Sequence, residues 1–243
     1  MDKKMKTGLI LLENSSCNFK SIVENLKKDW DMIIENTLED GTLSFNIGNN
    51  IIEMSLVKSK VSPDVEKSVK NNLFWENGEE KVKNHESYIR LEISGGKDSL
   101  KIANLFVKIA SVILKLENAI GIYTGVTILE AQMYIEVAAE LKNNELPVLD
   151  LVYFGFYKTD KGICGYTQGL TFFDKKEIEA IDTEIEFGDL FDFMIDVVNY
   201  VITSDVKLCD GETIGFSPEQ KLPITLSEGV AVEGTSIKIE VNR

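Results

Sequence analysis

The sequence contains few of the residues that usually build a reactive or metal-binding site. Its 243 residues include one histidine, His85, and three cysteines, Cys17, Cys164 and Cys209, which are far apart and form no Cys-x-x-Cys pair. This cysteine set argues against a disulfide framework and a cysteine-based zinc site, and it indicates a reducing compartment. A site built from several histidines is excluded. We therefore expect no metal and no cofactor, and a capping or surface role for His85.

Prolines and long apolar runs are also scarce. The chain has four prolines, and 27% of its residues are charged against 44% that are hydrophobic, which is typical of a globular protein. The first apolar run, at residues 9–12, follows lysines but is too short for an export signal. No run approaches the ~20 residues that cross a bilayer. These absences predict a soluble, cytoplasmic protein with no membrane contact.

Basic residues are outnumbered by acidic ones, 26 to 40, which gives a formal net charge of −14. Residues 1–94 carry 16 acids and 13 bases (−3), whereas residues 95–243 carry 24 acids and 13 bases (−11). This balance argues against nucleic-acid binding, because binding to phosphates requires clusters of Lys and Arg. A basic protein is the partner that such a charge favours.

The pattern of apolar residues predicts an α+β fold made of two packed α/β halves, residues 1–97 and 98–243. In the first half, strands are expected at 7–12, 42–47, 51–57 and 88–93, with helices near 18–30 and 64–84. The order β-α-β-β-α-β is typical of a ferredoxin-like unit. Gly48-Asn49-Asn50 predicts the hairpin turn between the two middle strands.

The second half alternates helices and strands less regularly. Helices are expected at 98–116, 128–141 and 187–202, and strands at 119–123, 147–157, 162–173 and 179–183, followed by a β-rich tail. The connection at 160–162 is too short for a parallel crossover, so the two strands that it joins are antiparallel. We therefore expect mixed or antiparallel sheets.

One short motif suggests nucleotide chemistry. The run Ser94-Gly95-Gly96-Lys97-Asp98-Ser99 stands between a predicted strand and a predicted helix and resembles the SGGxDS signature of PP-loop ATP pyrophosphatases. In such a site, backbone N–H groups and serine hydroxyls would bind a pyrophosphate at the helix N-terminus. The residues of this alternative ATP site are Ser94, Gly95, Gly96, Asp98 and Ser99.

Three features favour a structural interpretation of the same run. About 90 residues that form a complete predicted unit precede it, and an antiparallel pair, not further parallel βα units, follows it. Glycines that bend the chain and a capping Asp98 or Ser99 are also what a strand-to-helix turn requires. We interpret the run as such a turn and keep an ATP-binding enzyme as the alternative.

Acidic side chains gather on one predicted helix and in the loop that follows it. Asp189, Asp192 and Asp196 lie opposite the apolar stripe of the helix at 187–202, at positions i, i+3 and i+7. The loop at 210–219 adds Asp210, Glu212 and Glu219. These six carboxylates form either an ordinary solvated surface or a surface that binds a basic partner.

The C-terminal third carries a family resemblance. Its most distinctive run is Asp210-Gly-Glu-Thr-Ile-Gly-Phe-Ser-Pro-Glu-Gln-Lys-Leu-Pro-Ile-Thr225, followed by Ser227-Glu-Gly229 and preceded by Gly165-Tyr-Thr-Gln-Gly169. This region, about 165–243, resembles the bacterial proteins grouped as domain of unknown function 4261, most strongly over Gly165–Val241. The resemblance implies no catalytic residues.

Together these observations favour a non-enzymatic protein-interaction module over an enzyme. One form of this hypothesis is an immunity-type protein that neutralises a basic effector. The sequence has no His pair, no Cys-His pair, no Gly-x-Ser-x-Gly elbow and no second phosphate-loop signature.

Overall fold

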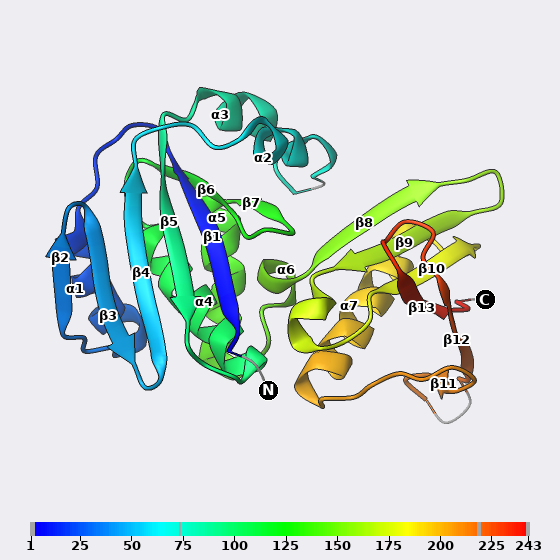
Figure 1. Cartoon of the computed structure of the whole chain (residues 1–243). Coiled ribbons are helices and arrows are strands. Elements are labelled where there is room, and N and C mark those ends of the chain that lie inside the picture. The colour runs from blue at the N-terminus through cyan, green and yellow to red at the C-terminus, as the bar shows by residue number, and fades with distance from the viewer. Residues whose placement is uncertain (1–2, 73, 218–219, 242–243) are drawn as a thin grey trace. The chain divides into compact units, whose positions relative to one another are not determined.

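The computed structural model of the chain describes residues 3–72, 74–217 and 220–241. It forms two compact units, Met1–Leu151 and Val152–Arg243, each with its own β-sheet (Figure 1). Within the described residues, the sheet of the first unit is antiparallel and that of the second is mixed. The predicted α+β class with antiparallel and mixed sheets is therefore confirmed.

The first unit is built on a seven-stranded sheet, in the order β2-β3-β4-β5-β1-β6-β7 within its described residues. The strands are β1 (Met5–Leu12), β2 (Asn36–Glu39), β3 (Thr42–Ile47), β4 (Asn50–Val57), β5 (Ser87–Ser94), β6 (Ala119–Tyr123) and β7 (Ile128–Glu130). β6 pairs with β1, Ile122 opposite Ile10, and so belongs to the same sheet. The first unit consequently extends to Leu151 and does not end at residue 97, where the sequence places the boundary.

The β3–β4 hairpin lies where the sequence predicts it. Gly48 adopts a φ of 58°, and β4 begins at Asn50, so this turn reverses the chain. The sequence does not predict β2, the strand beside β3 at the edge of the sheet. All four residues of β2 are exposed and only Leu38 among them is apolar, so no alternating pattern marks the strand.

The strand order differs from that of a ferredoxin-like sheet. In a ferredoxin-like unit the first strand lies between the last two, and both helices cover one face. Here β5 lies between β4 and β1 and is antiparallel to both. The chain between β4 and β5 covers the opposite face of the sheet from the helix α1 (Phe19–Trp30) (Figure 1).

Helices cover both faces of this sheet. One layer contains α1 (Phe19–Trp30), α4 (Ser99–Ile113) and α5 (Ala131–Ala138), and the other contains α2 (Pro63–Ser68), η1 (Val69–Asn71) and α3 (Gly78–Asn84). The unit continues through η2 (Ala139–Asn143) and ends with α6 (Val148–Leu151). α4 lies close to β1, because a Cβ added to Gly8 would stand 2.5 Å from the ring of Phe106.

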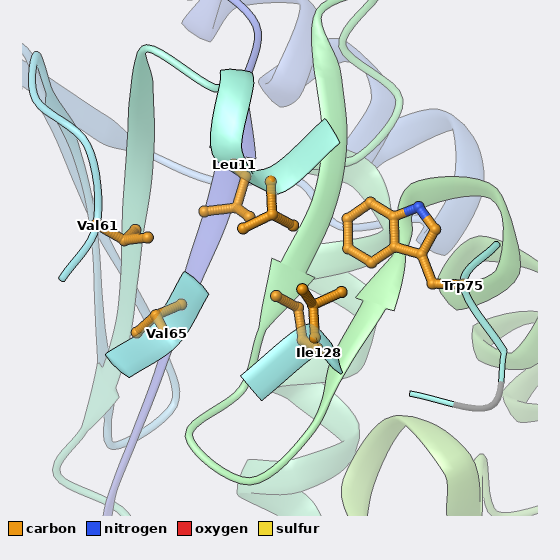
Figure 2. Packing of buried hydrophobic residues seen from close by; sticks show 7 residues of the cluster. Leu11, Val61, Val65, Trp75 and Ile128 are labelled. Atoms are coloured by element: carbon orange, nitrogen blue, oxygen red, sulfur yellow. The ribbon is translucent and has the colours of Figure 1, made fainter. Parts of the chain in front are cut away.

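The second helical layer is held by a cluster of buried apolar side chains (Figure 2). Its members are Leu11, Val61, Val65, Val69, Trp75, Val82 and Ile128. His85 is fully buried in the same unit: the Val61 N–H donates to its Nε2 at 2.9 Å, and its Nδ1 bonds with the carbonyl of Val82. His85 is the C-cap of α3, which is one of the two roles expected from the sequence, but it is buried and does not lie at the surface.

The second unit has a six-stranded sheet, in the order β11-β12-β13-β10-β9-β8 within its described residues. The strands are β8 (Tyr153–Lys158), β9 (Ile163–Gln168), β10 (Ile178–Thr183), β11 (Thr213–Ile214), β12 (Leu222–Glu228) and β13 (Thr235–Ile239). β10 and β13 are parallel, and the β8–β9 pair is antiparallel, as the short connection predicts. β8 is shorter than predicted because the residues before it form α6.

One long helix, α7 (Phe187–Thr203), packs on this sheet, and the short η3 (Leu170–Phe173) connects β9 to β10. The contact is close: a Cβ on Gly165 would lie 2.5 Å from the sulfur of Met194. The rings of Phe156 and Phe191 meet at 5.9 Å on the same side of the sheet. The apolar stripe predicted for this helix is therefore the stripe that faces the sheet.

Candidate functional site

The polar side of α7 carries the predicted acidic residues. Asp189, Asp192 and Asp196 are exposed, while the opposite side of the helix is buried against the sheet. We call these three residues the acidic row. Tyr200 stands one further turn along, four residues after Asp196, and is 44% exposed. Since residues three and four positions apart are neighbours on a helix, the acidic row leads directly to this tyrosine.

A hollow of about 810 Å³ lies at the C-terminal end of α7. Its walls are formed by Tyr200 and by residues 206–208 and 211–216. We call it the loop pocket. All of these residues belong to the second unit, and most come from the segment after α7 that contains two of the predicted loop acids.

Asp210 and Glu212 shape this loop. Asp210 Oδ1 accepts the N–H of Leu226 at 2.7 Å, and Glu212 Oε2 accepts the N–H of Cys209 at 2.8 Å. Between them Gly211 adopts a φ of 79° and donates its N–H to the carbonyl of Ile224 at 3.0 Å. Both acids are exposed and both also hold a tight turn against β12, a structural role in addition to the predicted one.

The loop contacts α7 beside the acidic row, through a ring at the edge of the buried side of the helix. The ring of Phe216 lies edge-on to that of Phe193, with centroids 5.8 Å apart, and Phe216 remains 53% exposed. Phe193 follows Asp192 directly and is three residues before Asp196. The structure thus places the acidic row and the loop on neighbouring parts of one surface. Glu219, the remaining predicted acid, lies outside the described residues.

The electrostatic surroundings are negative. Residues 152–243 contain 17 acidic and 8 basic residues, a net charge of −9. The last turn of α7 has no basic residue, so its terminal carbonyls add to the negative potential at the loop pocket. Lys175 forms an ion pair with Asp205, with 2.5 Å between its Nζ and Oδ1 of the carboxylate. This ion pair lowers the pKa of the Asp205 carboxyl.

The Ser94–Ser99 run forms a tight turn against the β3–β4 hairpin. Ser94 ends β5 and Ser99 begins α4. Gly95 has a φ of 100°, and a Cβ there would stand 2.5 Å from the carbonyl oxygen of Asn49. A Cβ on Gly96 would stand 2.3 Å from Asn50 Oδ1. Gly95 is therefore required by its backbone conformation and by the close carbonyl, whereas a side chain at Gly96 would have to displace the Asn50 side chain.

Asp98 caps the helix that follows this turn. Its Oδ1 accepts the N–H of Lys101 at 3.1 Å, and its Oδ2 lies 3.1 Å from the Lys101 ammonium. The bond from the Lys101 N–H is the main cause of the lowered pKa of Asp98. A hollow of about 670 Å³ lies beside the turn. The helix N-terminus already has a carboxylate, and β5 is antiparallel to both neighbours, unlike a strand in a parallel nucleotide-binding sheet.

The first unit contains a buried polar pair that the sequence pattern does not predict. Asp150 and Tyr134 are both fully buried, and neither carboxylate oxygen of Asp150 nor the hydroxyl of Tyr134 has a hydrogen-bond partner. Burial, and then the charge of Glu140, raises the pKa of Asp150 well above its ordinary value. Burial and the charge of Asp150 raise the pKa of Tyr134 in turn. The one signal in the sequence was an acid within the apolar run Leu146–Leu151.

In the part of the chain that the structure describes, no group of three or more His, Cys, Asp or Glu side chains is arranged to hold a metal ion. In the same part, every helix is too short or too polar to cross a membrane.

The second unit is thus defined as an α+β unit in which a mixed sheet carries one long helix with an acidic outer side. A family model, domain of unknown function (DUF4261), matches residues 166–240, a stretch from β9 to β13 that includes α7 and the loop pocket. The resemblance inferred from Gly165–Val241 is confirmed over these residues. Searches of curated proteins and of solved structures gave no match for this chain.

Proposed function

We propose that this chain is a non-enzymatic binding module whose second unit captures a basic segment of another protein. The binding surface comprises the acidic row and the adjoining loop pocket. The observation that carries the proposal is their adjacency: three exposed aspartates lead along α7 to a pocket rimmed by two exposed aromatic rings.

Two physical arguments support this surface. A net charge of −9 over residues 152–243 attracts a cationic partner over long range and speeds its association. Exposed aromatic side chains at the pocket provide the apolar contacts that usually dominate interface energies. Neither the acidic row nor Phe216 contributes to the buried core of the unit.

The finer form of the proposal is an immunity-type role, in which the module neutralises a basic effector protein. The support for this role is the complementarity between the net charge of −9 over residues 152–243 and the positive charge of such an effector. The three cysteines, which are free thiols, support a reducing compartment such as the cytoplasm for this binding.

The test is a pull-down from native lysate with the full chain and two charge variants. The first variant, Asp189→Asn, Asp192→Asn and Asp196→Asn, neutralises the acidic row. The matched control, Asp160→Asn, Glu233→Gln and Glu240→Gln, removes the same charge from exposed acids elsewhere in the second unit. We expect wild type and the control to recover a common basic protein, and the row variant to lose it.

The recovery should also fall as salt rises, since exposed charges are screened beyond about 8 Å at 0.15 M ionic strength. If all three forms recover the same proteins, or if none recovers any, the acidic row is only a solvated surface and the proposed function fails.

A further inference from the structure

The loop pocket combines aromatic and negative groups in one hollow. Tyr200 and Phe216 are 44% and 53% exposed, although rings of this size are usually well buried in a protein of this class. Both contribute to the same pocket, one from α7 and the other from the loop. Aromatic faces of this kind attract cations through their quadrupole.

Three further groups determine the charge of the pocket. Glu212 lies in its wall and uses Oε2 for the Cys209 N–H, which leaves a carboxylate with capacity for more hydrogen bonds. The C-terminal end of α7, where the helix dipole carries a partial negative charge, lies at this pocket. Among the described residues of the pocket wall, Lys207 is the one cation; it is exposed, and its charge makes a minor contribution to the lowered pKa of Asp205.

We propose that the loop pocket is a binding site for a single arginine side chain of the basic partner, with its guanidinium against Tyr200 and Phe216 and hydrogen-bonded to Glu212. This inference rests on the proposed function and assigns the anchor of that interaction. Arginine fits better than lysine because its planar guanidinium stacks on aromatic rings and bonds a carboxylate with two N–H groups. The hollow of about 810 Å³ has room for the whole side chain.

The acidic row and the pocket have different tasks in this arrangement. The exposed carboxylates of the row attract any cationic segment and mainly affect the association rate. The pocket selects one side chain by shape and hydrogen bonding and mainly affects the dissociation rate. Binding in the loop pocket should therefore be measurable with a ligand that has only one positive charge.

The probe is an acetylated and amidated five-residue peptide with one arginine between glycines. It is titrated into the full-length ¹⁵N-labelled chain while amide signals are followed. Two matched peptides replace the arginine by citrulline, its uncharged isostere, or by lysine. We expect the arginine peptide to shift the signals of Tyr200, Gly211, Glu212, Gly215 and Phe216. The citrulline peptide should bind about 10-fold more weakly, and the lysine peptide should lie between the two.

Three variants test the named groups. Glu212→Gln keeps an acceptor for the Cys209 N–H but removes the charge, and should weaken arginine binding about 5-fold. Tyr200→Ala removes the ring and should weaken it about 3-fold. Tyr200→Phe keeps the ring and should bind as wild type does. Unchanged amide signals in the rest of the second unit show that each variant is folded.

The results separate this inference from the proposed function. Pocket signals that do not move with the arginine peptide, or equal binding of the citrulline peptide, overturn the arginine site even if the acidic row recovers a basic protein. Arginine binding that depends on Glu212 and Tyr200 supports the site even if the pull-down fails. Glu212→Gln and Tyr200→Ala that bind the peptide as wild type does also overturn the site.

Discussion

At the scale of single residues, two buried acids have pKa values that are shifted in opposite directions. Burial disfavours the charged form of Glu179, but bonds from Ser236, from the N–H groups of Ala231 and Val230, and from Lys238 outweigh it and lower its pKa. Asp150 has no hydrogen-bond partner for either oxygen, and its pKa is raised. Glu179 is therefore a charged carboxylate that holds the segment before β13 by accepting its N–H groups, whereas Asp150 is most stable as a neutral acid.

Asp150 should make the stability of the protein fall as the pH rises. Its folded-state pKa lies well above the ordinary value of 3.8, so the folded chain binds this proton more tightly than the unfolded chain does. The stabilisation is complete below about pH 4 and is lost up to the folded-state pKa, by at most about 1.4 kcal/mol per pH unit. Asp150→Asn cannot ionise, so its free energy of unfolding should exceed that of wild type at pH 8 by a margin that shrinks as the pH falls towards 5.

Urea unfolding at pH 5, 6.5 and 8 measures this difference. Glu140, the charged group that acts on Asp150, and Tyr134 are present in both proteins, so subtraction isolates the aspartate. The exposed-acid variant Asp160→Asn serves as the control and should follow wild type at every pH. Parallel curves for wild type and Asp150→Asn would show that the carboxyl finds a partner in solution.

At the scale of elements, the Ser94–Ser99 turn should behave as a cap and not as a nucleotide site. Asp98→Ala removes the acceptor for the Lys101 N–H and should lower the free energy of unfolding by about 1 kcal/mol. Lys97→Ala, a change at an exposed residue of the same turn, should leave the free energy of unfolding unchanged.

Calorimetric titration of wild type with ATP and Mg²⁺ should show no binding. Micromolar binding that disappears in Asp98→Ala would instead establish the ATP-binding alternative.

The elements that the sequence predicts best are those with strong periodicity or distinct turn residues. The apolar stripes of α4 and α7 and the Gly48 turn predict their elements closely. The sequence does not predict β2, because its residues are exposed, and it assigns α6 to β8, because a short apolar run is compatible with either structure. The strand order of the first sheet differs from that of a ferredoxin-like unit, because the order of elements along the chain does not reveal which strands pair.

The candidate site was only partly predictable for a similar reason. Charge and helical spacing are local properties of the chain, and they are sufficient to identify the acidic row. The loop pocket depends on Phe216 reaching Phe193 across 23 residues of sequence, a contact that no local pattern encodes. The bond from the Leu226 N–H to Asp210 joins residues that the fold brings together, whereas the bond from the Cys209 N–H to Glu212 spans only three residues of the chain. Pockets and buried pairs are products of tertiary structure.

At the scale of the whole molecule, the net charge of −14 is a source of self-repulsion. Asp192 and Asp196 are four residues apart on α7, where like charges destabilise a helix by about 0.2–0.5 kcal/mol. The double variant Asp192→Asn and Asp196→Asn removes this pair and two units of the net charge. Asp189 is kept because a negative charge in the first turn of a helix is favourable.

We expect this double variant to be more stable than wild type by about 0.5 kcal/mol at low salt, and to match it at 0.5 M salt, where the repulsion is screened. Urea unfolding at the two salt concentrations measures the effect. A control with Asp160→Asn and Glu240→Gln carries the same net charge without the helical pair and should gain less. A gain in stability on losing these acids would show that the fold does not require them, which is the expected property of a surface maintained for binding. A loss of stability would assign the acidic row to the fold and weaken the proposed function.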